Sequence, residues 1–248
     1  MSTPLPGALR LAFSTAAHQP AIERLFDPAI KNSIDPDGQV AGRAGEMFAH
    51  HVAQGHATVL EDDQGNVHAL TMAWHLSAPG DKHPRPRHIE IGTALTRMPG
   101  FHSASVVTSA MALAEWWRPT LARGLMAGEV GNDNIASTKL FRDTLGWRPL
   151  QNKQAVTDLN KLSYADIIDY NHINDSKTWY VCNHQALSKA AAILLAVMDS
   201  AKLTNKKTGQ SISVDISAIT EIGLTKPRLE VLAERFRSKK ALRAVAPD

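Results

Sequence analysis

Two β-rich segments lie close together in the sequence. Residues 57–61 and 67–76 are separated by only five residues, 62–66, four of which are polar. Such a spacing is typical of an antiparallel hairpin, whereas parallel neighbouring strands need a crossover of a dozen or more residues. The segments therefore exclude a pure strand–helix–strand repeat. They favour an α/β fold with a partly antiparallel sheet flanked by helices.

Further elements are predicted on both sides of this hairpin by the period of the apolar residues and by Gly and Pro stops. Helical spacing and strand-like runs alternate over the first 150 residues, and we find no internal repeat. We expect strands at residues 9–13, 88–96 and 124–130, helices at residues 20–26, 44–54, 103–117 and 135–145, and an extended run from Trp147.

The pattern changes after about residue 161. Residues 185–201 predict a long helix, and residues 227–240 predict an amphipathic helix with a proline near its first turn. Residues 212–222 fit a strand or a helix, because their isoleucines match both periods. We therefore expect one domain over residues 1–161 and a mostly helical C-terminal part over residues 162–248.

The composition is that of an ordinary globular protein. Its 248 residues are 44% hydrophobic and 21% charged, which argues against global disorder. No apolar run approaches the roughly 20 residues of a membrane-spanning helix, and no secretory signal is visible, so we expect a cytoplasmic protein without membrane association. A single cysteine, Cys182, rules out an internal disulfide and a cysteine-cluster zinc site. The eleven histidines show no ligand spacing, so we expect no metal.

Positive charge is concentrated towards the C-terminus. Residues 184–248 contain 11 Lys and Arg against 6 Asp and Glu. A basic segment of this kind can bind nucleic acid, and it can equally be a solvated helix face. No aromatic residue alternates with the last basic residues, which weakens the case for a surface that stacks bases. Both interpretations remain open.

The most informative stretch runs from Gly124 to Trp147. A strand-like run is followed by a helical segment and then by a Gly-Trp pair. In this order it resembles the GNAT superfamily of acyl-CoA-dependent N-acyltransferases. In that family a strand ends with V-x-x-x-N, and the helix that follows carries a small residue, then a Leu-aromatic pair, and is followed by a Leu-Gly-aromatic sequence. The spacing to the final glycine is one residue longer here. The matching residues are Val130, Asn134, Ser137, Leu140, Phe141, Leu145, Gly146 and Trp147.

A second part of the resemblance lies between residues 97 and 103, before the predicted helix. The family has Gln or Arg, two residues, Gly, one residue and then Gly or Ala; Arg97 and Gly100 fit, and His102 stands where a small residue is usual. Main-chain N–H groups of such a loop, with the N-terminus of the next helix, bind phosphate. The resemblance implies that Arg97, Gly100, Phe101, His102 and Ser103 hold the CoA pyrophosphate. The alternative is an ordinary turn before a helix.

The third part of the resemblance is Glu90, in the sequence His-Ile-Glu-Ile-Gly. Many family members carry a general base at this point of the central strand, because a protonated amine must lose a proton before it attacks a thioester. A Glu exposed on the strand or held in an ion pair is the alternative, and Glu129 is the reserve candidate. Phe141 stands where the family often has a tyrosine acid, and it has no hydroxyl.

The resemblance covers about residues 8–160 and implies a mixed sheet of six or seven strands with helices on both sides. Acyl-CoA, acetyl-CoA in the simplest case, would lie where two central parallel strands diverge. Leu95 and Thr96 would pair with the pantetheine arm, and Asn134, Ser137 and Phe141 would line the thioester end.

The activity implied is N-acetyltransferase, moving the acyl group from CoA directly to a primary amine. His102 and Phe141 leave a catalytically impaired acyl-CoA-binding module as one alternative. The basic C-terminal part leaves a modifier of amino groups in nucleic acid as another. The acceptor, the acyl preference and the oligomeric state are not readable from the sequence.

Overall fold

One mixed sheet organises the protein. The computed structural model describes residues 6–27, 30, 45–77, 88–113, 125–163 and 176–234. Within them the strands form a single nine-stranded sheet in the order β6-β7-β5-β4-β3-β2-β1-β9-β8. The predicted α/β class is confirmed, but the expected six or seven strands were too few, because β8 and β9 of the C-terminal part extend the sheet beyond β1.

The strands follow the predicted positions closely in the first half of the chain. The hairpin of β2 and β3 is antiparallel as predicted, and β3 also pairs antiparallel with β4. The bounds are β1 Ala8–Phe13, β2 Ala57–Glu61, β3 Val67–Leu76, β4 His88–Thr96, β5 Met126–Gly131, β6 Arg148–Pro149, β7 Lys177–Val181, β8 Lys202–Thr204 and β9 Ser211–Asp215.

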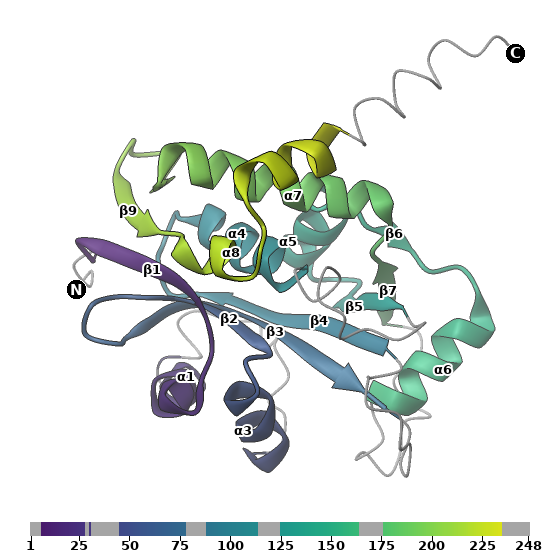
Figure 1. Cartoon of the computed structure of the whole chain (residues 1–248). Helices are drawn as coiled ribbons and strands as arrows, with labels where there is room; N and C mark the ends of the chain where they lie inside the picture. Colours follow the sequence, from purple (N-terminus) through teal and green to yellow (C-terminus); the bar gives the residue numbers. More distant parts are fainter. Residues whose placement is uncertain are drawn as a thin grey trace, which may run out of the picture.

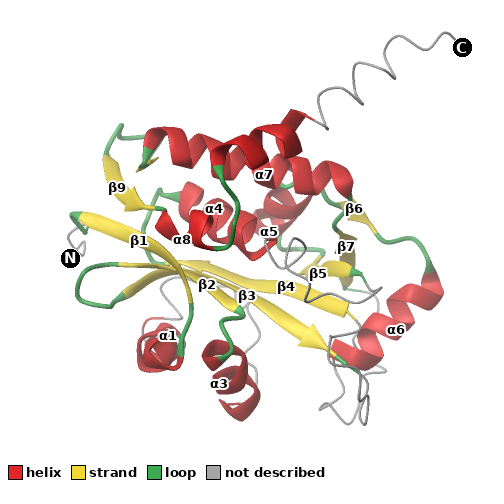
Figure 2. Ribbon diagram, viewed as in Figure 1, coloured by secondary structure: helices red, strands yellow, loops and turns green. Residues whose placement is uncertain are grey.

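Helices cover both faces of the sheet. Figures 1 and 2 show α1 and α3 on one face and α4, α5, α7 and α8 on the other. The bounds are η1 Ala16–His18, α1 Gln19–Leu25, α3 Gly45–Ala53, α4 His102–Ala112, α5 Ile135–Thr138, the π-helical turn η3 Lys139–Thr144, α6 Lys153–Ser163, α7 His184–Ser200 and α8 Ser217–Glu221; residues 226–234 are also helical.

Helix α6 and strand β8 were not predicted from the sequence. In α6, Val156, Leu159 and Leu162 follow the helical period, and Leu159 is fully buried. Two predicted helices extend beyond the described residues: the end of the helix expected at 103–117, which includes Trp116 and Trp117, and the end of the helix expected at 227–240. Residues 162–170, for which the sequence also predicts a short helix, lie almost wholly outside them.

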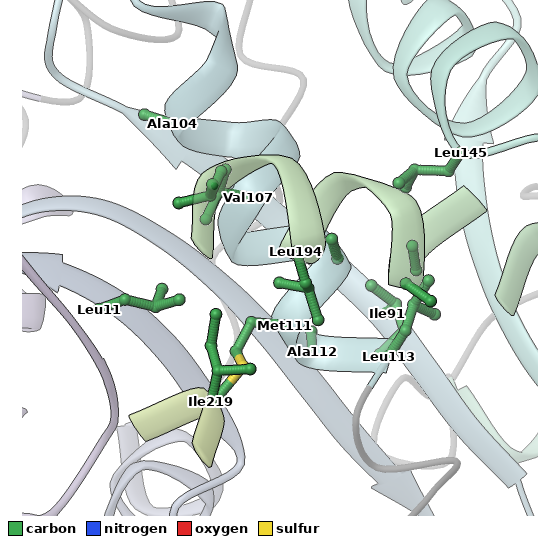
Figure 3. Close-up of a cluster of buried hydrophobic side chains, with 14 of the residues drawn as sticks. Leu11, Ile91, Ala104, Val107, Met111, Ala112, Leu113, Leu145, Leu194 and Ile219 are labelled. Carbon is green, nitrogen blue, oxygen red and sulfur yellow. The ribbon is translucent and has the colours of Figure 1, made fainter. Parts of the chain in front are cut away.

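Two hydrophobic clusters lie on opposite faces of the sheet. The cluster under α1 and α3 includes Ile22, Val52 and Trp74. The larger cluster joins β1, β4, α4, α7 and α8, and Figure 3 shows Leu194 of α7 beside Met111 and Ala112 of α4. Burial on both faces explains why β2 and β3 carry almost continuous apolar runs.

The C-terminal part packs into this architecture. Strand β7 pairs with both β5 and β6, while β9 pairs parallel with β1. The segment at 212–222, which fitted both periods, forms a strand and then a helix. Ile212 and Val214 of β9 and Ile219 of α8 are buried. The division of the chain at residue 161 stays a prediction, and the sheet runs across it.

No helix among the described residues is long and apolar enough to cross a membrane.

Candidate functional site

The two central parallel strands separate shortly after they meet. Strands β4 and β5 pair only at Ile89 with Met126 and at Glu90 with Ala127 in the described structure. Beyond Glu90, β4 continues to Thr96 and β5 to Gly131 without further pairing to each other. The predicted divergence of two central parallel strands is therefore present, and it begins at Glu90.

A β-bulge bends β4 within this diverging stretch. The register with β3 passes from Gly92 opposite Met72 to Leu95 opposite Leu70, so two residues of β4, Thr93 and Ala94, face one residue of β3. Thr93 has a φ of 53°, which is uncommon for a β-branched residue. The sequence gives no sign of this bulge. The bulge interrupts the regular pairing of β4 with β3 in the stretch where β4 no longer pairs with β5.

Glu90 lies on the α1 and α3 face of β4. The residue is buried, with 6% of its surface exposed, and it stands opposite Trp74 of β3. Its Oε1 would be 3.5 Å from a Cβ placed on Gly92, and the indole Nε1 of Trp74 would be 3.9 Å from the same point. The alternation predicted for this strand holds, because Ile89 and Ile91 point into the cluster on the opposite face. Glu90 is thus a buried carboxylate at the start of the divergence.

Glu129, the reserve candidate, is differently placed. Its Oε2 lies 3.0 Å from the Nζ of Lys177 on the neighbouring strand β7. This ion pair links the Glu129 carboxylate to the neighbouring strand β7.

The loop after β4 leads directly into α4 and exposes main-chain donors. Gly100 has a φ of 80°, a conformation that favours glycine. In the described structure the N–H groups of Gly100, His102 and Ser103 donate to no protein acceptor. The hydroxyl of Ser103 is also without a hydrogen-bond partner although its oxygen is buried. Unused donors at the start of an 11-residue helix are the arrangement that binds phosphate groups.

The side chains of this loop divide into two groups. Phe101 is completely buried in the core and its N–H donates to the carbonyl of Met98 at 3.2 Å, so it offers no free donor to a ligand. His102 is exposed at the first position of α4. Arg97 is half-exposed, and its N–H donates to the carbonyl of His68 at 2.9 Å. His102 is therefore not buried within the loop. Leu95 and Thr96 pair with Leu70 and Ala69 of β3, which leaves their roles towards pantetheine as predictions.

On the β5 side, Asn134 and Ser137 form a helix cap. The Oδ1 of Asn134 accepts a hydrogen bond from the N–H of Ser137 at 2.9 Å. This contact explains the Asn-x-x-Ser spacing physically, since an Asn at the N-cap satisfies one of the free donors of the helix. Both residues are half-exposed, as are Gly92, Thr93 and Ala94 of β4. The two sides of the divergence are therefore partly accessible.

The inner end of the divergence is closed by Phe141. A Cβ on Gly128 would lie 2.8 Å from both the carbonyl oxygen of Ile91 and the ring of Phe141. The ring also contacts Trp147 edge-on, with centroids 4.9 Å apart. Gly128 was not singled out by sequence analysis, although a glycine inside a strand often marks a close approach of this kind. Phe141 is 3% exposed, so it packs at the divergence rather than reaching solvent.

The C-terminal part touches this region at both ends. The Nζ of Lys189 on α7 donates to the carbonyl of Asp143 at 3.1 Å. At the other end, the carboxamide of Asn205, between β8 and β9, lies against Gly100. Sequence analysis gave no reason to place either residue here, because both contacts join segments far apart in the chain.

A histidine cluster lies near the C-terminus of α3, where the sequence predicted none. The Nδ1 atoms of His51 and His56 are 2.9 Å apart, and the ring of His56 stacks on that of His75 with centroids 3.5 Å apart. Across the described residues, no three His, Cys, Asp or Glu side chains are arranged to hold a metal ion. Cys182 is buried as expected, and burial raises the pKa of its thiol, which makes it a poor nucleophile.

A depression in the described structure lies elsewhere. About 470 Å³ in volume, it lies between β1, η1 and α8 and contains none of the predicted site residues. In it, Glu61 accepts hydrogen bonds from Arg10, and its Oε2 lies 3.0 Å from the Nε2 of His18. His18 in turn accepts from the N–H of Thr15 at the start of η1, so this group stabilises the local turn.

Comparison with known proteins gives a match of fold only. No protein-family profile and no curated protein matches the chain. A GCN5-related N-acetyltransferase from Brucella melitensis superposes with a TM-score of 0.50 at 12% identity, covering 82% of this chain and 87% of that one. A GNAT-family acetyltransferase from Listeria monocytogenes gives 0.43 at 9% identity, covering 69% and 92%. RimL, a ribosomal L7/L12 alpha-N-protein acetyltransferase in complex with coenzyme A, gives 0.40 at 17%, covering 72% and 96%. The chain has the fold of the GCN5-related N-acetyltransferases.

Proposed function

We propose that the protein is an acyl-CoA-dependent N-acyltransferase that transfers an acyl group, acetyl in the simplest case, to a primary amine. The observation that carries this proposal is the set of unused donors at Gly100, His102 and Ser103, placed where β4 leads into α4 beside the divergence from β5. The fold shared with a GCN5-related N-acetyltransferase supports it.

The loop residues would hold the phosphate end of the co-substrate. The N–H groups of Gly100, His102 and Ser103 and the hydroxyl of Ser103 would donate to phosphate oxygens, and the N-terminus of α4 adds favourable charge. Arg97, half-exposed beside them, supplies a positive side chain. When bound, acyl-CoA would supply an acyl group activated as a thioester.

Glu90 would remove the proton of the amine. Its buried carboxylate lies at the point where β4 and β5 separate, on the face opposite α4. As nitrogen bonds to the acyl carbon, the carboxylate takes the N–H proton, and the carbon–sulfur bond breaks to release a thiolate. Phe141 provides no acid, so the thiolate would be protonated by water. Main-chain N–H groups at the bulge of β4 would stabilise the developing oxyanion.

Direct binding and turnover test this function. Titration calorimetry with acetyl-CoA should show saturable binding, and a panel of primary amines should release free thiol with at least one member. Gly100→Ala should abolish binding, because the added methyl strains a φ of 80° and overlaps with Asn205. Gly65→Ala is the matched control: its φ is 75°, and nothing lies within 4 Å of the added carbon. Absence of binding to the wild-type protein contradicts the proposal.

A further inference from the structure

The turn between β8 and β9 packs against the loop between β4 and α4, which the proposed function identifies as the phosphate-binding loop. A Cβ on Gly100 would lie 3.0 Å from the Cγ and 3.1 Å from the Oδ1 of Asn205. Asn205 is 6% exposed, so its carboxamide is enclosed by this contact and by its own turn. Figure 1 shows β9 beside the start of α4. The loop thus has a second wall that comes from the C-terminal part.

Hydrogen bonds fix the conformation of this turn. The Oδ1 of Asn205 accepts from the N–H of Lys207 at 3.0 Å and from the N–H of Thr208 at 3.4 Å. The N–H of Asn205 donates to Gln210, and the N–H of Gly209 donates back to Asn205, both at 2.8 Å. A side chain that closes its own turn in this way holds the next residues in one place.

Two lysines follow Asn205 in this turn. Lys206 and Lys207 directly follow Asn205 and are exposed. In the described part of the chain neither forms an ion pair. Consecutive Cα atoms are about 3.8 Å apart, so the Cα atoms of Lys206 and Lys207 lie within about 8 Å of that of Asn205, whose carboxamide contacts Gly100. Arg97, half-exposed in the loop, adds a positive side chain to this region.

We propose that Lys206 and Lys207 form a second, electrostatic wall of the phosphate site and bind the phosphate groups of the co-substrate. This proposal rests on the proposed function and extends it to residues outside the resembling segment. The loop amides fix the position of the anion through main-chain donors. The lysines add to the positive charge that Arg97 supplies beside the loop.

Binding of adenosine 3′,5′-bisphosphate tests the proposal without requiring turnover. In calorimetry at low salt, the double variant Lys206→Ala/Lys207→Ala should bind this probe at least 10-fold more weakly than the wild type, with a shallower dependence of affinity on salt. Lys206→Arg/Lys207→Arg should restore binding. The control is Lys153→Ala/Lys161→Ala, two exposed lysines of α6, at the opposite end of the sheet from β9 in Figure 1.

A second comparison separates this proposal from the proposed function. Turnover of acetyl-CoA should suffer in the lysine variant through a raised KM, whereas turnover of acetyl-pantetheine, which lacks the nucleotide phosphates, should not change. Equal affinity of the wild type and the lysine variant for the bisphosphate overturns the lysine assignment alone. A wild type that binds neither the bisphosphate nor acetyl-CoA overturns both.

Discussion

Glu90 shows how one residue acquires a functional environment from its neighbours. Its sequence context, between two isoleucines, places it on the opposite face from their side chains, and the structure buries it beside Trp74 at the last paired position of β4 and β5. Burial shields the carboxylate from water, and the pairing of β4 with β5 ends at this residue. Glu129 forms an ion pair with Lys177 on the neighbouring strand β7.

Replacing Glu90 by Gln should lower kcat by about 100-fold or more, which is typical for loss of a general base. The loss should be greatest at low pH, where the amine is protonated, and should shrink as the pH approaches the pKa of the amine. Steady-state thiol release across pH measures this. Glu129→Gln serves as the control and should keep most of the activity. Equal turnover of Glu90→Gln and wild type at every pH would reject the role of Glu90.

Asp62 in the hairpin turn governs stability rather than chemistry. Burial raises the pKa of its carboxyl, but hydrogen bonds from His68 and Asn66 outweigh this effect and lower the pKa to about 2 from an ordinary 3.8. The folded state therefore binds the proton less tightly than the unfolded state. The stabilisation is complete above about pH 4 and is lost as the pH falls towards 2.

We expect Asp62→Asn to reduce the free energy of unfolding at pH 7 by about 1–2 kcal/mol, allowing for solvent screening at the turn. Urea denaturation from pH 7 down to pH 2 should show the wild type and the variant converging as the carboxyl becomes protonated. A difference that stays constant over this range would mean that the charge is not responsible.

At the level of elements, the segment after β5 explains an irregularity in the sequence. The resembling motif has one extra residue before Gly146, and the structure accommodates it as the π-helical turn η3. The N–H of Leu145 donates to the carbonyl of Leu140 at 2.8 Å, five residues back. A π-turn absorbs one inserted residue while the helix keeps its direction. Phe141 and Trp147 consequently still meet.

Gly128→Ala tests how closely this turn packs on the strands. The added methyl would lie 2.8 Å from the carbonyl of Ile91 and from the ring of Phe141, so we expect a loss of about 1–3 kcal/mol in stability. Thermal and urea unfolding measure it. Phe141→Leu in the same protein should recover part of the loss, because a smaller side chain makes room. Purely additive losses would show that Phe141 does not limit the space.

Helix α4 is attached to the sheet by buried hydroxyl groups. The Oγ1 of Thr71 on β3 lies 2.9 Å from the Oγ1 of Thr108 and 3.1 Å from the Oγ of Ser109. The hydroxyl of Thr58 on β2 donates to the carbonyl of Thr108 at 2.7 Å. These contacts hold the helix whose N-terminus forms the proposed phosphate site.

Thr71→Val should destabilise the protein by about 1–3 kcal/mol, because it keeps the volume but removes the hydrogen-bond partner of the buried Ser109 hydroxyl. Urea unfolding of Thr71→Val, Ser109→Ala and the double variant forms a thermodynamic cycle. The double variant should lose less than the sum of the two single losses. Full additivity would contradict a direct interaction between the two side chains.

At the scale of the whole molecule, the C-terminal part completes the sheet and the larger core. Leu203, Ile212, Val214 and Ile219 are at most 3% exposed and pack in the same cluster as Leu11 and Met111. Burial of a large aliphatic side chain contributes about 1.5–3 kcal/mol, so the four together approach the total stability of a typical domain.

Deleting residues 201–248 should therefore abolish cooperative unfolding of the remaining chain. Removal of β9 also exposes the edge of β1, which favours association between chains. Circular dichroism during heating, with size-exclusion chromatography, measures both effects. A truncated chain that stays monomeric and melts at the wild-type temperature would instead support a separable C-terminal part, as the division at residue 161 predicts.

Local sequence determined the features whose causes lie within a few residues. The hairpin of β2 and β3, the cap formed by Asn134 and Ser137, and the alternation that buries Ile89 and Ile91 all follow from spacing. Such patterns also carried the resemblance, and the matching fold confirmed what it implied about architecture.

Tertiary structure decided the contacts between distant segments. Nothing near Gly100 in the sequence indicates Asn205, and nothing near Gly128 indicates that Phe141 will pack on it. The bulge at Thr93 and the place of β9 beside β1 likewise depend on which strands become neighbours. The free energy of burial depends on the entire core, so the pairing of distant segments is determined only when the whole chain folds. Hydrophobic periodicity, by contrast, is a property of each segment's own sequence.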